Sequence, residues 1–262
     1  MTQAGTDESA SNNRRLNKVP LVTLGFWLIK ICATTVGETG GDALSMTLKL
    51  GYAVSTLIFL ALFVIALAAQ VRAKRYHPAV YWTVVVTTTT VGTTTSDFFD
   101  RTLGIGYVVS SIILSAIVVG VLGVWRWAAG RIEFENIQTR RDEVFYWLTI
   151  LVSNTLGTAL GDYVADDAGL GFQRGALVFA VLLALVAATH LFTRLSKSVV
   201  FWAAYVLTRP LGATIGDTLT KPRSAGGFAL GRIASSAVIG GVLVLLIVIT
   251  EWRNEQAPTA AS

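Results

Sequence analysis

Four long runs of apolar residues that contain no Asp, Glu, Lys or Arg are the feature that most limits how this chain can fold. They cover residues 50–71, 102–125, 175–193 and 233–250. A hydrocarbon core of about 30 Å is crossed by roughly 20 helical residues, so each run is long enough to span a membrane. Apolar residues make up 53% of the chain and charged residues only 14%, whereas soluble proteins have about 25% charged residues. This balance disfavours a water-soluble enzyme and excludes a disordered chain.

Four further segments are more polar but have the same length. They cover residues 19–37, 76–96, 144–161 and 198–216, and they carry Thr, Gly and occasional charges. The sequence therefore predicts eight transmembrane helices in one membrane domain, residues 19–252, between polar tails at 1–18 and 253–262. The polar first eighteen residues do not resemble a removable signal peptide.

The basic residues are divided unequally between the two ends of the predicted helices. Of the 21 Lys and Arg residues, thirteen lie in the N-terminal segment and in the links that follow even-numbered spans, and six lie at the opposite end. The positive-inside rule then places both termini in the cytoplasm, and we expect a bacterial inner membrane. All seven Trp residues are expected at the inner interface. Lys30, inside the first span, is expected to extend its ammonium group toward that interface.

A four-fold internal repeat appears when the odd-numbered spans are aligned. Each copy has Trp, then Gly ten residues later, then Asp after five more and Gly after nine more, and an aromatic residue precedes each Trp. The four frames are Trp27, Gly37, Asp42, Gly51; Trp82, Gly92, Asp97, Gly106; Trp147, Gly157, Asp162, Gly171; and Trp202, Gly212, Asp217, Gly226. Four matches without gaps identify a true repeat.

On these tryptophans and their Gly–Asp partners, residues 20–252 resemble a bacterial membrane-protein family built from four tandem repeats of unknown function. The resemblance implies two transmembrane segments in each repeat and supports the eight-span topology. It implies no activity, substrate or catalytic residue.

The repeat also predicts the symmetry of the fold. Units with two spans all enter the membrane in the same direction, so the copies at about 19–75, 76–130, 144–195 and 198–252 are parallel repeats. We expect an all-α bundle that is pseudo-two-fold or pseudo-four-fold about the membrane normal. The polar odd spans should lie inside it and the apolar even spans toward lipid.

The repeated aspartates are expected to share one level of the bundle. Each lies fifteen residues beyond its Trp, about 22 Å along a helix, near the outer edge of the membrane. Two residues break the symmetry: Glu38, where the other repeats have Thr93, Thr158 and Ala213, and Arg209, where they have Thr34, Thr89 and Asn154.

One interpretation of these groups is a site for a proton or a hard cation. Four close carboxylates cannot all stay ionised without a cation, so Asp42, Asp97, Asp162, Asp217 and Glu38 are candidates to exchange protons against Mn, Mg or Ca. Glu38 and Asp42 are the candidate metal ligands. The candidate path also includes the polar side chains of Arg209, Asn154, Thr34, Thr89 and Thr93.

A structural interpretation explains the same residues. Gly or Ser recurs four residues after the first Gly of each motif, and small residues at this spacing let helices pack closely in lipid. The candidate packing glycines are Gly37, Gly41, Gly92, Gly157, Gly161, Gly212 and Gly216. Asp97 and Asp217 could form surface ion pairs with Arg101 and Lys221, and Glu38 could form a buried pair with Arg209.

Several hypotheses for function therefore remain open. The favoured one is a transporter or exporter of a hard cation, or a proton-coupled carrier. The alternatives are a passive ion channel, a transporter of a small organic anion anchored by Arg209, a membrane enzyme and a non-catalytic scaffold.

No catalytic triad, zinc spacing, phosphate loop or dinucleotide fingerprint is present, so we predict no enzymatic activity, no cofactor and no nucleic-acid partner. The expected partners are the lipid bilayer and a transported ion or small molecule. The oligomeric state is not predicted.

Overall fold

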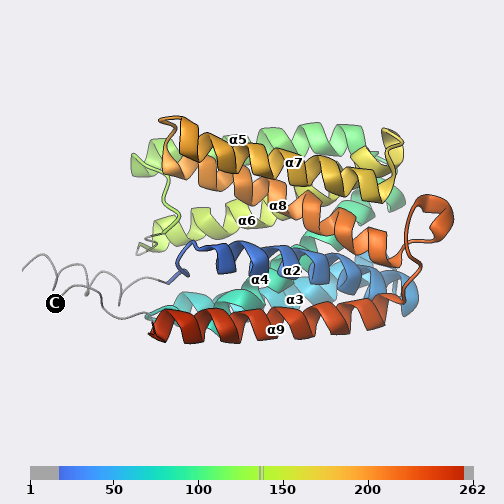
Figure 1. Cartoon of the computed structure of the whole chain (residues 1–262), viewed down its shortest axis with the longest axis horizontal. Helices are drawn as coiled ribbons and strands as arrows, with labels where there is room; N and C mark the ends of the chain where they lie inside the picture. The colour runs from blue at the N-terminus through green and yellow to red at the C-terminus, as the bar shows by residue number, and fades with distance from the viewer. Residues whose placement is uncertain (1–17, 136, 138, 257–262) are drawn as a thin grey trace, which may run out of the picture.

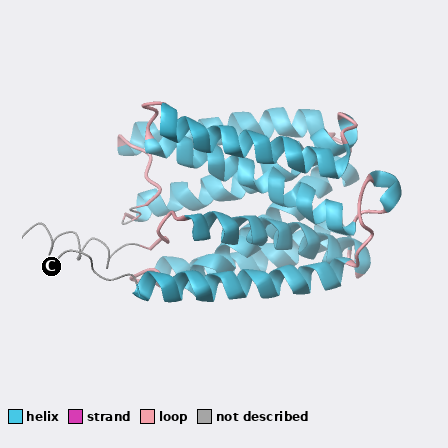
Figure 2. Cartoon of the chain, viewed as in Figure 1, coloured by secondary structure: helices cyan, strands magenta, loops and turns pink. Residues whose placement is uncertain are grey.

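The computed structural model describes residues 18–135, 137 and 139–256, and in these residues it contains eight long helices and no strand (Figure 2). The long helices are α2 (Leu24–Asp42), α3 (Gly51–Arg72), α4 (Pro78–Asp97), α5 (Tyr107–Ala129), α6 (Arg140–Asp162), α7 (Gly171–Phe192), α8 (Lys197–Thr220) and α9 (Arg232–Gln256). The all-α prediction is confirmed. Most of the predicted tails, residues 1–17 and 257–262, lies outside the described residues.

Local sequence signals set where several helices begin and end. The hydroxyls of Thr23, Thr139 and Ser196 accept hydrogen bonds from backbone N–H groups in the first turns of α2, α6 and α8. Because Thr23 caps α2, that helix begins five residues later than the predicted span. A five-residue π-helical turn follows the motif Asp of the first three repeats: η1 (Ala43–Thr47), η2 (Phe98–Thr102) and η3 (Tyr163–Asp167).

The eight helices form an inner and an outer layer (Figure 1). The first helices of the repeats, α2, α4, α6 and α8, form a closed inner ring in which each packs against two others. The second helix of each repeat packs mainly against the first helix of the next repeat: α3 on α4, α5 on α6 and α7 on α8. The last helix, α9, returns to α2 and closes the circle. Each repeat thus depends on its neighbour for its packing.

Burial agrees with this arrangement. The most apolar windows of α3, α5, α7 and α9 are only 11–22% buried, whereas those of α6 and α8 are 67% buried. These six helices are long and apolar enough to cross a membrane, and α2 and α4 are the two that fall outside this set. α2 and α4 belong to the inner ring, where neighbouring helices rather than lipid surround them, so polar side chains are tolerated there. The prediction of polar helices inside and apolar helices outside is confirmed.

The repeated tryptophans do not face lipid as a group, which corrects the interfacial prediction. Trp82, Trp147 and Trp202 are each less than 5% exposed. Each packs against the aromatic residue that precedes the Trp of the previous repeat, and Phe201 of the last repeat packs against Trp27 of the first with ring centroids 5.7 Å apart. The paired aromatics therefore interlock the inner ring. Only Trp127 and Trp252 are largely exposed among the seven.

Candidate functional site: a polar column on the bundle axis

The inner helices carry buried side chains at every fourth residue, and equivalent residues of the four repeats form five layers along the ring. From the end where α2 begins, they are the aromatic layer (Phe26, Tyr81, Tyr146, Phe201), the lysine layer (Lys30, Val85, Ile150, Tyr205), the arginine layer (Thr34, Thr89, Asn154, Arg209), the glutamate layer (Glu38, Thr93, Thr158, Ala213) and the aspartate layer (Asp42, Asp97, Asp162, Asp217). All twenty side chains are buried. Sixteen residues separate the first layer from the last, about 24 Å along a helix.

The aspartate layer brings the four repeated carboxylates together at one end of the ring, where cations of the chain pair with them. Arg101 joins two of them, with Nε 2.9 Å from Asp97 Oδ1 and Nη2 3.0 Å from Asp162 Oδ2. Lys221 joins the other two, with Nζ 3.2 Å from Asp217 Oδ1 and 3.4 Å from Asp42 Oδ2. The predicted pairs of Asp97 and Asp217 are present, but their carboxylates are buried rather than on the surface.

These ion pairs have a two-fold pattern. Arg101 and Lys221 occupy equivalent positions of the second and fourth repeats, and each binds its own Asp and the Asp of the following repeat. Arg232 adds a further contact to Asp42 at 3.4 Å.

Lys221 lies just beyond the end of α8. Burial lowers the pKa of Lys221, but the carboxylates of Asp217 and Asp42 outweigh this effect and raise that pKa well above its usual value. Lys221 is therefore a fixed positive charge.

One layer deeper, Arg209 and Glu38 form the predicted buried pair. Arg209 Nη2 lies 3.0 Å from Glu38 Oε2, and the two side chains are 0% and 3% exposed. The same nitrogen donates to the hydroxyls of Thr93, at 2.5 Å, and Thr158, at 2.7 Å. Arg209 on α8 thus reaches the glutamate-layer residues of α2, α4 and α6. Its own helix supplies the small Ala213 at that level.

The guanidinium group of Arg209 is only partly satisfied by these contacts. All of its hydrogen bonds run through Nη2, and Nε and Nη1 have no partner among the described residues. A buried donor without a partner costs about 1–3 kcal/mol, and more when it is charged. Arg209 therefore presents unused cationic N–H groups inside the bundle.

Lys30 is a second buried basic residue in the column, and its position corrects the prediction that it extends to the interface. The side chain is 0% exposed, and Nζ lies 3.9 Å from the centre of the Tyr205 ring. Nζ donates no hydrogen bond to a carboxylate or carbonyl in the described part of the chain. Below the aspartate layer, the column thus contains two basic residues and one acidic residue.

The aromatic layer closes the other end of the column. The hydroxyl groups of Tyr81 and Tyr146 are 2.6 Å apart and share a hydrogen bond. The rings of Phe26 and Phe201 lie beside each other with centroids 6.1 Å apart. Both ends of the column are therefore closed in this structure, one by ion pairs and one by rings.

The motif glycines lie where neighbouring inner helices approach most closely. A Cβ atom at Gly37 would overlap Thr89, and one at Gly212 would overlap Thr34. A Cβ at Gly157 would overlap Arg209, and one at Gly92 would lie 2.8 Å from the backbone of Asn154. Each glycine thus accommodates the arginine-layer residue of the next repeat. Gly41, Gly161 and Gly216 face Thr93, Ala213 and Glu38 of the next repeat in the same way, at 3.1–3.5 Å.

The polar path residues mostly bond to helix backbones. Thr34 donates to Lys30 O and Ile31 O, and Thr89 donates to Ala33 O on α2 at 3.3 Å. Asn154 Nδ2 donates to Thr88, while its Oδ1 has no partner among the described residues. Threonine hydroxyls that bond in this way are satisfied without a ligand.

The candidate metal ligands do not form an open cluster of oxygens. Glu38 Oε2 is bound by Arg209, and Asp42 Oδ2 is contacted by Lys221 and Arg232. In the part of the chain that the structure describes, no group of three or more His, Cys, Asp and Glu side chains is placed to hold a metal ion. The site residues predicted from the sequence did not include Lys30, Tyr81 or Tyr146. Two positions of the repeat carried a signal for them. The third residue after the repeated Trp aligns Lys30 with Tyr205, and the residue before the Trp aligns Tyr81 with Tyr146.

Interlocked two-helix repeats around a buried polar column define an all-helical protein with helices suited to a membrane. The chain belongs to the family described as Repeat of Unknown Function (DUF347), whose repeat matches residues 25–76, 80–131, 145–196 and 200–255. Each match contains one inner and one outer helix. The comparisons with curated proteins and with solved structures give no match.

Proposed function

We propose that this protein is a membrane transporter whose substrate path is the axis of the inner ring, and that its substrate is a small anion bound by Arg209. The observation that carries the proposal is the set of N–H groups on the buried guanidinium of Arg209 that have no partner within the described residues. Arginine binds carboxylate and phosphate groups through such donors. The buried Nζ of Lys30, which has no hydrogen-bond partner among the described residues, provides a further donor on the same axis.

The closed ends of the column support alternating access. A path that is sealed by ion pairs at the aspartate layer and by the Tyr81–Tyr146 hydrogen bond at the aromatic layer can open at one end at a time. Parallel repeats that move against each other about a central site are one known design for such transport. A continuously open channel fits these two closures less well.

Uptake by proteoliposomes tests the proposal. The probes are radiolabelled formate, acetate, lactate and inorganic phosphate, each measured with and without a pH gradient. We expect protein-dependent uptake of at least one anion, reduced about tenfold by Arg209→Lys because lysine lacks the planar set of donors. Arg253→Gln, an exposed change at the end of α9, should leave uptake unchanged.

Lys30→Met provides a variant that separates function from folding. Removing a buried amine that has no hydrogen-bond partner among the described residues should raise the thermal stability and still lower anion uptake, since the column loses one of its two basic side chains. Uptake that is unaffected by both Arg209→Lys and Lys30→Met would overturn the proposal, as would the absence of protein-dependent uptake of every anion.

A second candidate is the proton-coupled transport of a hard cation, favoured by the convergence of Asp42, Asp97, Asp162 and Asp217 in one layer. In this case opening of the Arg101 and Lys221 ion pairs would free the carboxylates for Mn, Mg or Ca. Radiolabelled manganese in the same vesicles distinguishes the two. Manganese uptake that is lost in Asp162→Asn and kept in Lys30→Met would favour the cation.

We further infer that both chain termini face the cytoplasm, in a bacterial inner membrane. The support is the excess of Lys and Arg in the links at the end of the bundle where α2 begins and α9 ends.

A further inference from the structure

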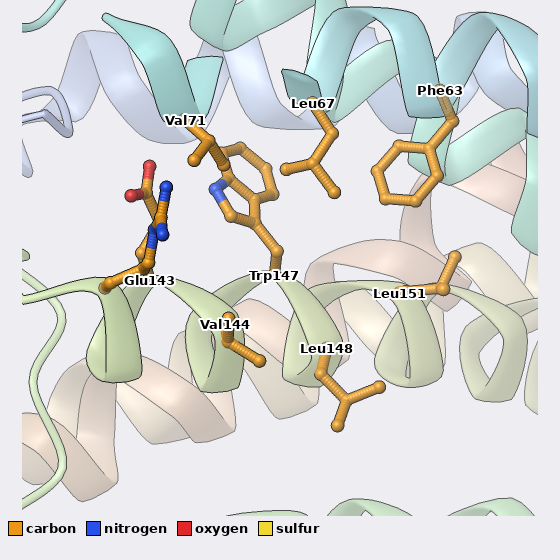
Figure 3. Close-up of a pocket in the computed structure, with 9 residues that line it drawn as sticks. Phe63, Leu67, Val71, Glu143, Val144, Trp147, Leu148 and Leu151 are labelled. Atoms are coloured by element: carbon orange, nitrogen blue, oxygen red, sulfur yellow. The ribbon is translucent and has the colours of Figure 1, made fainter. Parts of the chain in front are cut away.

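Two apolar pockets of similar size lie between outer and inner helices at equivalent places of the repeats. One, of about 360 Å³, lies between α3 and α6 and includes Leu67 and Trp147 (Figure 3). The other, of about 390 Å³, lies between α5 and α8 and includes the equivalent residues Leu122 and Trp202. We refer to them as the α3–α6 pocket and the α5–α8 pocket.

The α3–α6 pocket runs along the outer surface from the first turn of α6 into the bundle wall. Its lining extends on α6 from Arg140 to Leu151, about 16 Å along the helix axis. In Figure 3, Trp147 points from α6 toward Val71 and Leu67 of α3, and Phe63 lies farther along α3. The outer helix α3 is among the least buried and most apolar of the chain, so the pocket opens toward the region that lipid chains occupy.

A basic residue distinguishes the two pockets. Arg140, at the first position of α6, lines the α3–α6 pocket. It is exposed and forms no hydrogen bond or ion pair with the described part of the chain. The equivalent residue of the fourth repeat is Leu195, so the α5–α8 pocket has no such charge. The carboxylate of Glu143 at the same mouth is paired with Lys18 Nζ at 2.9 Å, which leaves Arg140 as the unbalanced charge there.

We propose that the α3–α6 pocket binds one anionic phospholipid, with its phosphate at Arg140 and an acyl chain along Leu67, Trp147 and Leu151. The geometry matches an amphipathic ligand: a cation at the helix end, where headgroups lie, followed by an apolar channel that continues into the hydrocarbon region. The proposal is independent of what the axial column transports.

Native mass spectrometry with a defined lipid mixture tests this site. The purified protein is mixed with equal amounts of phosphatidylglycerol and phosphatidylcholine that carry the same acyl chains. We expect the wild type to retain one phosphatidylglycerol, and Arg140→Gln to reduce this preference about fivefold, the contribution of one basic residue to binding of an anionic lipid. Arg253→Gln removes a charge from the same end of the bundle and should not change the preference.

Pocket-filling variants provide a second measurement that does not depend on charge. Leu67→Trp should abolish retention of the phosphatidylglycerol, whereas Leu122→Trp in the α5–α8 pocket should leave it intact. Equal retention of the two lipids by the wild type would overturn the proposal. The proposal would also fail if Arg140→Gln retained phosphatidylglycerol as the wild type does. It would fail as well if the wild type were a dimer that Leu67→Trp dissociates, because the pocket would then hold a second copy of the chain.

Discussion

Arg209 Nη2 lies 3.0 Å from Glu38 Oε2, although 171 residues separate the two in sequence. Glu38 belongs to the first repeat and Arg209 to the fourth, and each replaces a residue that is uncharged in the other three copies. The pair therefore joins the first and last repeats at the glutamate layer of the inner ring. It also makes this level asymmetric, while the aspartate layer has a two-fold pattern and the helices repeat four times.

Breaking this pair on one side should destabilise the protein more than removing it entirely. Glu38→Gln leaves the buried Arg209 without a countercharge and should cost about 3–5 kcal/mol. The double variant Glu38→Gln with Arg209→Met should recover most of that loss, because no buried charge remains. Reversible unfolding in mixed micelles measures both. A double variant as unstable as Glu38→Gln alone would show that the pair is not what stabilises this level.

The close approach of α2 to α4 at Gly37 predicts a strong difference between two neighbouring glycines. Gly37→Ala should cost about 1–3 kcal/mol, because the added Cβ overlaps Thr89. Gly40→Ala, three residues later in the same helix, meets no atom within 4 Å and should be neutral or slightly stabilising, since alanine favours the helix. Thermal unfolding in detergent compares them. Equal effects of the two substitutions would contradict the close packing.

Because the pKa of Lys221 is raised, we expect Lys221 to contribute to stability at neutral pH and to lose this contribution at alkaline pH. Asp217 and Asp42 raise the pKa of Lys221 in the folded state, so its contribution is complete below the unfolded pKa of about 10.4 and is lost as the pH rises through the folded value. Lys221→Met should therefore be less stable than the wild type at neutral pH, and the difference should narrow above a pH of about 10.4. Melting temperatures measured across this range check it. The exposed substitution Lys74→Met should show no such difference at any pH, and a constant difference for Lys221→Met would rule out the ionic contribution.

Labelling of single cysteines tests the membrane orientation. In a Cys32→Ser background, Arg75→Cys lies in the link between α3 and α4, and Ser224→Cys lies in the link between α8 and α9 at the other end. With cytoplasmic termini, a membrane-impermeant maleimide added to intact cells should label position 224 and not position 75. The reverse pattern would place the termini outside, and labelling of both positions would contradict a bundle that spans the membrane.

Much of the fold follows from local patterns. Apolar runs predict the outer helices, and the spacing of Trp, Gly and Asp identifies four repeats of two helices each. The polar first helices are predicted inside because their Thr, Gly and charged residues are costly in lipid. The candidate site was partly predictable as well: the break in symmetry singled out Glu38 and Arg209, and the spacing of four residues singled out Asp97 with Arg101 and Asp217 with Lys221.

Which repeat contacts which could not be read from these patterns. Equivalent residues have the same local sequence whether the outer helix packs on its own inner helix or on that of the next repeat. The interlocked order, with α9 closing on α2, depends on how all eight surfaces fit together. The tryptophans show this most clearly, since their indole rings pack on aromatics of the neighbouring repeat instead of facing the membrane interface.

By itself, the sequence determined that this chain forms four parallel two-helix repeats with carboxylates near one end, because hydrophobicity and helical period act over short distances along the chain. Only the tertiary structure decided how the charges are paired. It places Arg101 and Lys221 between aspartates of different repeats, and it leaves Lys30 Nζ and part of the Arg209 guanidinium buried without a hydrogen-bond partner among the residues that the structure describes. Such pairings depend on distances of a few ångströms between helices far apart in sequence, and Coulomb and hydrogen-bond energies at those distances determine what the column can bind.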